Sequence, residues 1–571
     1  MAPFKRGGLG GTSHGGREGK QGRLQCPIDC RVYALRSRLG VTTGRAASPR
    51  RLRKGEQVTR QLPISPRRHS AFDESGYAAT VDRILEQTRA LYLADSVPWV
   101  VGYSGGKDST AVLQLVWLSL AGLPPEKLTK PVHVISTDTL VENPVVAAWV
   151  THSLDVLAEQ ANTQHLPITP HRLTPTVTDT FWVNLIGRGY PAPRPKFRWC
   201  TERLKIKPSN SFIRAMVRSH GEAILVLGTR KAESSGRSHR MTALEAKRSR
   251  DLLSPNESLP NCLVYSPVEN WSNDDVWTFL MQTPNPWGYS NKELLTMYQG
   301  ASPDGECPLV VDSTTPSCGD SRFGCWTCTL VDKDKSMSAM IQNDDEKEWM
   351  LPLLELRNAL DVGDDRHLRD FRRMNGSVQL FNDKPIPGPY TQESRERWLT
   401  QLLEAQTWIR LNGPDYVRSL ELVTLAELEE IRRLWVVEKH EFEDNLPRIY
   451  RSATGEEYPG KPLDEHLPLG SEAIEVLKEV IGGDRLHFEL VRELLDIEQR
   501  HRSRARRAGL FDSLEKALRR GFYDDEADAT SRANTRKATL ERPGTGSPDM
   551  VPDPLDVVDG FIRPAQAGAD K

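Results

Sequence analysis

The chain has few cysteines, no long apolar run and almost no net charge, and each shortage excludes a class of protein. Eight cysteines in 571 residues are too few for a secreted disulfide scaffold. The longest mostly apolar stretch, Ala111 to Leu123, is too short to span a bilayer, and the amino terminus has no apolar signal-peptide core. These features predict a soluble, cytoplasmic protein with reduced thiols and no membrane contact.

The formal net charge of −1 hides an uneven distribution of charge. Residues 1–70 contain 16 Lys and Arg but only 3 Asp and Glu, so the remaining residues carry a net charge of −14. This first segment is rich in Gly, Arg and Ser and has no sustained periodicity, which predicts a disordered basic tail. Nucleic-acid binding elsewhere in the chain would depend on local basic patches rather than on the overall field.

The most informative stretch is WVVGYSGGKDSTAVL, from Trp99 to Leu113. An apolar run ends at Gly102, a glycine-rich turn follows and an amphipathic run begins after it, which predicts a strand, a tight loop and a helix. Such a loop directs backbone N–H groups toward one point at a helix amino terminus, where an anion is favoured. Asp108 follows Lys107, whereas the common nucleotide-binding loop requires Ser or Thr there. The stretch predicts a phosphate or pyrophosphate site that comprises Ser104, Gly105, Gly106, Lys107, Asp108, Ser109 and Thr110.

Apolar segments alternate with helical ones around this loop. Residues 79–93 and 141–158 have helical spacing, whereas residues 131–137 and 223–227 form short apolar runs typical of buried strands. This alternation predicts an α/β fold with a parallel sheet, whose ligands bind at the carboxyl ends of the strands. An ordinary turn and helix cap is the alternative interpretation for Thr137 and Asp138. The ligand-binding residues predicted at strand ends are Thr137 and Asp138, and Gly228 and Arg230.

Cys200 lies in a dense basic segment with the aromatic residues Phe197 and Trp199. Basic and aromatic side chains together suit a polyanion. The positive charges would also lower the pKa of the thiol and favour the reactive thiolate. Cys200 is therefore a candidate catalytic residue and sulfur carrier, and a buried cysteine under a solvated basic face is the alternative. The basic residues of the segment are Arg194, Lys196, Arg198, Arg203, Lys205 and Lys207.

Four further cysteines lie within 22 positions: Cys307, Cys318, Cys325 and Cys328. Two residues between the last two let both sulfurs bind one metal centre, and four thiolates satisfy either a four-iron cluster or a zinc site. The spacing does not choose between these metals. Cys262 or Cys200 could replace Cys307 as the fourth ligand.

Beyond residue 340 the pattern is mostly helical, with a period near 3.6 residues over 348–360, 393–411, 425–440, 472–481 and 486–518. From about Asp528 the chain is polar with Pro and Gly, which predicts a disordered end. Seven arginines could either track a DNA backbone or form a solvated helix face: Arg500, Arg502, Arg504, Arg506, Arg507, Arg519 and Arg520.

The SGGKDS string resembles the pyrophosphate loop of the ATP pyrophosphatase superfamily, whose members cleave ATP between the α and β phosphates and adenylate a substrate. Five motifs resemble the phosphoadenosine-phosphosulfate reductase family in that family's order: SGGKDST, STDT, RWCTERLKIKP, GTRKAESSGR and YSPVENWSNDDVW. Two departures argue against sulfonucleotide reduction. The late nucleophilic cysteine of those reductases is absent after Cys328, and their double cysteine is replaced by Cys200 and Thr201.

Residues 285–337 and 422–450 resemble the DndC family of DNA phosphorothioation proteins, and the resemblance covers about residues 75–525. It implies an ATP pyrophosphatase with an iron–sulfur cluster that works with a cysteine desulfurase (DndA or an equivalent) and with DndD and DndE. In that system sulfur replaces a non-bridging phosphate oxygen of DNA. The implied cofactors are ATP, Mg²⁺ and a 4Fe-4S cluster, with zinc as the alternative.

The resulting hypothesis is an ATP-dependent sulfurtransferase that adenylates a DNA phosphate and passes sulfur to it. Lys107 stabilises charge, and Asp108 orients the loop or the metal rather than acting as a base. A sulfonucleotide reductase, an RNA thiolation enzyme and a non-catalytic DNA-binding scaffold are the alternatives. The expected organisation is a tail (1–70), an adenine nucleotide α-hydrolase-like ATP pyrophosphatase domain (71–300), a cysteine-rich metal segment (301–337), a helical domain (338–527) and a second tail (528–571).

Overall fold

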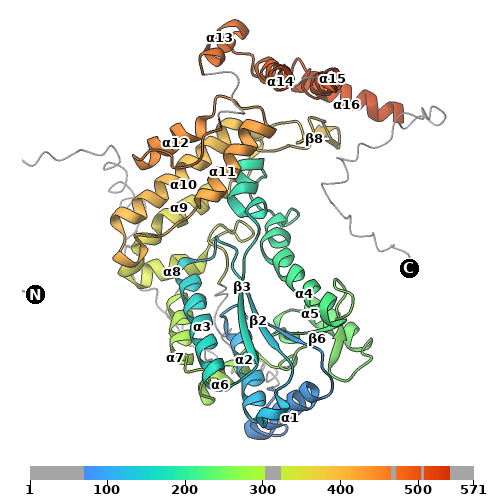
Figure 1. The fold of residues 1–571 in the computed structure, drawn as a ribbon, viewed down its shortest axis with the longest axis vertical. Helices are drawn as coiled ribbons and strands as arrows, with labels where there is room; N and C mark the ends of the chain where they lie inside the picture. The colour runs from blue at the N-terminus through green and yellow to red at the C-terminus, as the bar shows by residue number, and fades with distance from the viewer. Residues whose placement is uncertain (1–69, 303–322, 464–470, 503–506, 541–571) are drawn as a thin grey trace, which may run out of the picture. The chain divides into compact units, whose positions relative to one another are not determined.

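The computed structural model describes residues 70–302, 323–463, 471–502 and 507–540, all of which belong to one compact unit (Figure 1). The predicted amino-terminal tail and two of the predicted metal ligands, Cys307 and Cys318, lie outside the described residues. No helix in the part of the chain that is described is long and apolar enough to cross a membrane.

A six-stranded sheet forms the centre of the described region that carries the predicted phosphate loop (Figure 1). Its strands in chain order are β1 (Trp99–Gly102), β2 (Val132–Thr137), β3 (Ile168–Leu173), β4 (Ala223–Val226), β5 (Leu253–Pro255) and β6 (Cys262–Tyr265). Their order in the sheet is β3-β2-β1-β4-β6-β5, and every neighbouring pair is parallel except β5 and β6. The predicted α/β fold with a parallel sheet is therefore confirmed. The strand order reverses between β1 and β4, which is where open parallel sheets bind ligands.

Helices cover both faces of this sheet. They are α1 (Tyr77–Leu93), α2 (Lys107–Ala121), α3 (Pro144–Thr163), α4 (Lys207–His220), α5 (Ser235–Glu245), α6 (Asn273–Gln282) and α7 (Asn291–Gly300). Helices α1, α2, α3 and α6 pack with Trp99 and Val101 on one face, whereas α4 packs with Val100 and Leu225 on the other. Because both faces are buried, the strands read as continuous apolar runs rather than as alternating patterns.

The sequence pattern does not predict β3, β5 or β6. β3 lies at the edge of the sheet and contains Pro170, which is tolerated at an edge because it does not need to donate a hydrogen bond there. Residues 178–187, whose spacing is also typical of a helix, form a 3₁₀ turn (Val177–Asp179) and a π-helical turn (Val183–Arg188). The backbone N–H and the side-chain amide of Asn184 both donate to the Thr180 carbonyl, at 3.2 and 2.8 Å.

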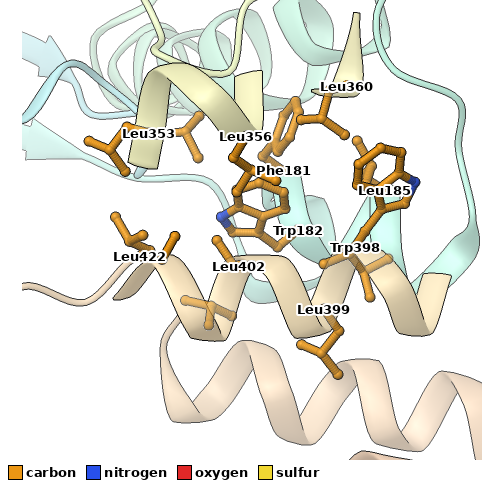
Figure 2. Close-up of a cluster of buried hydrophobic side chains, with 14 of the residues drawn as sticks. Phe181, Trp182, Leu185, Leu353, Leu356, Leu360, Trp398, Leu399, Leu402 and Leu422 are labelled. Atoms are coloured by element: carbon orange, nitrogen blue, oxygen red, sulfur yellow. The ribbon is translucent and has the colours of Figure 1, made fainter. Parts of the chain in front are cut away.

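A second hydrophobic core joins the segment after β3 to two later helices, α9 (Leu351–Leu360) and α10 (Gln392–Asn412) (Figure 2). Trp182 and Leu185 from that segment pack with Leu356 of α9 and Leu402 of α10 (Figure 2). The predicted boundary at residue 338 therefore divides a single core, because residues on both sides of it are buried together.

The rest of the described chain is mostly helical, as predicted. A short hairpin, β7 (Leu380–Phe381) and β8 (Lys384–Pro385), interrupts it. The remaining helices are α8 (Lys335–Asn343), α11 (Leu425–Arg433), α12 (Asn445–Thr454), α13 (Ser471–Ile481), α14 (Arg485–Arg502), α15 (Leu510–Gly521) and α16 (Glu526–Leu540).

Two predictions for the carboxyl-terminal helices are corrected. The helical period over residues 486–518 belongs to two helices that pack on each other, and α15 begins after Gly509, whose φ of +80° favours glycine. The second tail does not begin at Asp528, because α16 continues to Leu540. This stretch has no Gly or Pro before Pro543, and Ala529 and Ala533 are buried against Tyr523. The Pro and Gly that indicate a disordered end occur only from Pro543 onward, so the predicted boundary was too early in the chain.

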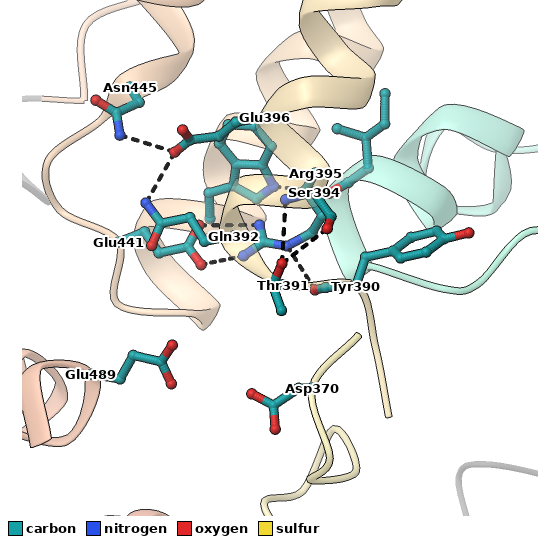
Figure 3. Close-up of polar contacts among 12 residues, drawn as sticks. Asp370, Tyr390, Thr391, Gln392, Ser394, Arg395, Glu396, Glu441, Asn445 and Glu489 are labelled. Atoms are coloured by element: carbon teal, nitrogen blue, oxygen red, sulfur yellow. Dashed lines mark hydrogen bonds and ion pairs between the residues drawn. The ribbon is translucent and has the colours of Figure 1, made fainter. Parts of the chain in front are cut away.

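Buried ion pairs connect α10 to the segments that follow it (Figure 3). Arg395 of α10 binds both carboxylate oxygens of Glu441, and both side chains are at least nine-tenths buried. Arg492 of α14 lies 2.6 Å from Glu443 and also donates to Gln392. Ion pairs buried in this way contribute little net stability, but a buried charge left without its partner would be costly. They therefore favour one arrangement of α10 against the segments that follow it.

Candidate active site

The predicted phosphate loop connects the carboxyl end of β1 to the amino terminus of α2. The Ser104 backbone N–H donates to the Ser109 hydroxyl at 3.1 Å, and that hydroxyl donates to the Gly106 carbonyl at 2.9 Å. The Thr110 hydroxyl donates to the same carbonyl at 2.9 Å. These bonds hold the loop in shape. The helix begins at Lys107, so the lysine belongs to its first turn.

Two glycines let other backbone segments approach the loop. Gly105 has a φ of +71°, and a Cβ there would lie 2.5 Å from Val150 of α3. A Cβ on Gly228, after β4, would lie 2.8 Å from the backbone of Asp108. Neither position accepts a side chain without moving the loop. The predicted site residues from β1 and β4 therefore lie in direct contact.

Ion pairs connect three charged side chains of the site. The Asp108 carboxylate accepts from Arg230 Nε at 2.7 Å and from Lys107 Nζ at 3.1 Å. Arg230 is buried and also donates to the Trp271 carbonyl at 3.3 Å. Lys107 Nζ lies 5.6 Å from the centre of the Tyr298 ring. In this arrangement the carboxylate of Asp108 holds two cations in place.

The loop forms one wall of an open cleft of about 1210 Å³ at the carboxyl ends of the central strands. All of the predicted ligand-binding residues at strand ends line it. Thr137 Oγ1 lies 2.9 Å from Ser209 Oγ of α4. Asp138 accepts from Arg172 and from the Leu140 backbone N–H, so its carboxylate supports a turn as well as facing the cleft.

Cys325 lies at the rim of the same cleft. Its segment forms an antiparallel bridge with Glu142, and the Trp326 N–H donates to the Val141 carbonyl at 2.9 Å. The sulfur lies 3.3 Å from Thr139 Oγ1 and 3.8 Å from Glu142 Oε1. Glu142 also lines the cleft, so one carboxylate connects the thiol with the nucleotide-sized cavity.

Two further thiols approach Cys325. The Cys328 N–H donates to the Cys325 carbonyl at 3.1 Å, which makes a tight turn between them. Cys200 is close enough to both to interact with them electrostatically. Lys205 Nζ lies 3.4 Å from Glu142 Oε1, and its half-exposed side chain lines the cleft. The structure therefore brings the basic segment and the last cysteine pair together.

The expected low thiol pKa is not found. Burial raises the pKa of Cys200 above its ordinary value and raises the pKa of Cys325 to about 12. Part of the positive charge of the segment is directed elsewhere, because Arg203 and Lys207 both bind Asp179. Lys205 opposes the effect of burial at both thiols without outweighing it.

The chemistry of this donor set fits zinc or an iron–sulfur cluster, since both bind thiolates. Within the described ranges, no group of three or more His, Cys, Asp or Glu side chains has the geometry of a metal site. A fourth thiolate would come from residues 303–322, which lie outside those ranges. Cys262 is buried on β6 beside Val100 and Ile213, in a different core from the other described cysteines.

The carboxyl-terminal arginines are largely engaged within the chain. Arg500 binds Asp496 and donates to two backbone carbonyls of residues 436 and 437. Arg507, Arg519 and Arg520 each pair with a glutamate. Arg504 and Arg506 lie outside the described residues. This favours the solvated, ion-paired helix face over a DNA track at these positions.

The sequence reasoning missed several cleft residues, among them Glu142, Arg172 and Tyr298. Glu142 could have been found, because it follows the predicted strand end at Asp138 by four positions. Arg172 ends a strand whose pattern is not apolar, and Tyr298 reaches the loop from α7, far along the chain. No local pattern marks these last two.

Residues 98–330 match the phosphoadenosine phosphosulfate reductase domain family. A curated relative, an uncharacterized protein of Methanocaldococcus jannaschii, is 26% identical over 190 residues, which cover 33% of this chain and about a third (32%) of that protein.

Among the solved structures that the chain matches is the phosphoadenylyl-sulfate reductase of Candida auris in a phosphate complex. It is 13% identical, with 36% of this chain and 87% of that one covered and a TM-score of 0.23. The tRNA thiolase NcsA of Methanococcus maripaludis, with its 4Fe-4S cluster, is 11% identical, with 50% and 79% covered and a TM-score of 0.25.

The family match spans β1, its phosphate loop, the cleft and the last cysteine pair, which are the features that form the candidate site. Residues 98–330 therefore resemble a phosphoadenosine phosphosulfate reductase domain.

Proposed function

We propose that this protein is an ATP-dependent sulfurtransferase that converts a DNA backbone phosphate into a phosphorothioate. One observation carries the proposal. Glu142 and Lys205 line the cleft that holds the phosphate loop, and both also face the thiol of Cys325. A phosphate-binding loop in the cleft, and a thiol group that lies behind two residues of the cleft wall, support a reaction in which ATP cleavage and sulfur transfer share one substrate.

ATP is expected to bind with its β and γ phosphates at the amino terminus of α2. The loop backbone and the helix dipole favour the anion there, and Lys107 adds a full positive charge. Mg²⁺ would reach the site on the phosphates, since it retains waters and needs few protein ligands. Arg230 and Asp108 hold the loop in position through their 2.7 Å contact.

In the first step a non-bridging oxygen of the DNA phosphate attacks the α-phosphorus of ATP and pyrophosphate leaves. The product is a mixed anhydride of AMP and the DNA phosphodiester. In the second step the terminal sulfur of a persulfide, formed by a cysteine desulfurase, attacks the DNA phosphorus, and AMP departs with the attacking oxygen. A second thiol then cleaves the S–S bond, which leaves the sulfur on the DNA and forms a disulfide. Adenylation is needed because an unactivated phosphate oxygen is a poor leaving group. A positioned cation such as Lys107 stabilises the charge that develops.

The thiols of Cys200, Cys325 and Cys328 are the candidate receiving point for sulfur. Thiolates of Cys325 and Cys328, with others from residues 303–322, would hold the metal centre, which when bound as an iron–sulfur cluster supplies a site for sulfide. Lys205 would attract the anionic sulfur and the DNA phosphate to the same rim. DndD and DndE are the expected partners for delivery and for DNA.

The test is to incubate the full chain with ATP, Mg²⁺, DNA, a cysteine desulfurase and cysteine under anaerobic conditions. Digestion of the DNA and mass spectrometry should reveal phosphorothioate dinucleotides that require ATP, and DndD and DndE are added if the chain alone is inactive. Unmodified DNA with all components present, together with thiolated RNA bases in a parallel incubation, would replace this proposal with RNA thiolation.

A sulfonucleotide reductase is the second candidate, because the family match itself favours it. That reaction needs a thiol that accepts the sulfonate, and no cysteine follows Cys328 in the chain. Formation of sulfite from phosphoadenylyl sulfate and thioredoxin, without ATP, would support the reductase and remove the sulfurtransferase.

A further inference from the structure

The outer face of α4 carries three basic side chains, and two of them have no ion-pair partner within the described part of the chain. Lys207, Arg214 and Arg218 are spaced by seven and four residues, so they share one face of the helix. Lys207 binds Asp179. Arg214 and Arg218 are exposed, and within the described part of the chain neither has a carboxylate within ion-pair distance. This differs from the carboxyl-terminal arginines, which are largely ion-paired.

An apolar slot of about 330 Å³ opens between these two arginines and the turn before β6. Its walls are the side chains of Ile213 and Val217, with Leu259 and Pro260 opposite. The volume lies near the lower end of small-molecule pockets, which begin at about 300 Å³. An apolar slot flanked by two guanidinium groups fits a flat, partly apolar ring attached to an anion.

The slot adjoins the active-site cleft. Ile213 and Leu259 line both, one on each wall. Ser209 and Asn210 extend the cleft along the first turns of the same helix. A chain-like ligand could therefore occupy the slot while one of its phosphates lies near the phosphate loop.

We propose that α4 is the nucleic-acid track of this enzyme, with Arg214 and Arg218 binding backbone phosphates and the slot holding one unpaired base next to the reacting phosphate. The inference rests on the proposed function, and it adds where the substrate strand lies and what part of it is recognised. Arginine binds phosphate in a bidentate manner and stacks on bases, so two arginines beside an apolar slot can recognise both parts of a nucleotide.

The experiment measures binding of a fluorescently labelled single-stranded oligodeoxynucleotide to the full chain by anisotropy at several salt concentrations. The variant R214A/R218A should bind at least about 10-fold more weakly at 0.1 M salt. Its plot of log affinity against log salt should be shallower by about 1.4, since each phosphate contact on a single strand contributes about 0.7. A matched control, R83A/K127A, removes two exposed cations that lie on α1 and before β2, and it should bind like the wild type.

A second variant separates the slot from the charges. V217W fills the slot, so it should weaken binding of the normal oligonucleotide while leaving an oligonucleotide with abasic sites unaffected. Wild-type affinity and salt dependence in R214A/R218A would overturn the proposal, as would failure of the wild type to bind any oligonucleotide. If R214A/R218A also bound acidic peptides or anionic vesicles more weakly, and to the same extent, α4 would be a general polyanion-binding surface instead.

Failure of this inference and failure of the proposed function are distinguishable. If R214A/R218A binds DNA normally and phosphorothioate still forms in the wild type, the track is wrong and the sulfurtransferase stands. If the variant loses DNA binding but the wild type makes no phosphorothioate, the track stands and the reaction is wrong.

Discussion

Replacing Lys107 with alanine should lower the rate of pyrophosphate release from ATP by about 100-fold or more. The expectation follows from its place in the first turn of α2, at the point where phosphate oxygens meet the loop backbone. Loss of one preorganised donor at developing charge typically costs about 100- to 1,000-fold in rate. The side chain is only 14% exposed, so water cannot replace its charge efficiently. The measurement is a coupled pyrophosphate assay with ATP, Mg²⁺ and DNA.

Two controls make this result specific. K127A removes an exposed lysine before β2 and should leave the rate unchanged. Unaltered thermal unfolding of K107A would show that the loop variant is folded, because Asp108 keeps its contact with Arg230. Pyrophosphate release near the wild-type rate in K107A would remove the loop from the mechanism.

Replacing Cys325 and Cys328 with serine should abolish phosphorothioate formation while leaving pyrophosphate release largely intact. Serine preserves the size of each side chain but lacks the soft thiolate that zinc and iron–sulfur clusters require. The two residues form one tight turn at the rim, whereas the phosphate loop is built from β1 and α2, so the two functions should separate.

Metal analysis of the protein purified without oxygen provides the readout. The wild type should contain about four irons and about four sulfides per chain, and the double variant should contain neither. C262A is the matched control, since that thiol is buried in a separate core and should leave the metal content unchanged. Zinc without iron in the wild type would make this segment structural, and loss of iron in C262A would reassign the fourth ligand.

The phosphate loop could be predicted in detail because its signals are local. Strand, glycines, lysine and helix lie within 15 consecutive residues, and each has one structural meaning at that spacing. The start of α6 has an equally local signal, since Ser272 and Asp275 lie three positions apart and each side chain bonds to the backbone of the other residue. The ion pair between Asp108 and Arg230 was not predictable, because 122 positions separate the two residues.

The thiol cluster shows where local reasoning fails. The pattern around Cys200 indicates many positive charges, but the effect on its pKa depends on where those side chains point. Asp179, which binds two of them, comes from a segment that the sequence marks only as helical. The same limit applies to the core around Trp182, whose partners in α9 and α10 follow more than 160 residues later.

The central claim is that ATP activates a DNA phosphate for attack by sulfur, and an oxygen-isotope measurement tests it most directly. DNA whose non-bridging phosphate oxygens carry ¹⁸O is incubated with the full chain, its sulfur source and unlabelled ATP, and the AMP is analysed by mass spectrometry. The account predicts one ¹⁸O atom from DNA in the AMP that accompanies each phosphorothioate formed. AMP that takes its new oxygen from water, with phosphorothioate formed at the same time, would contradict adenylation of DNA.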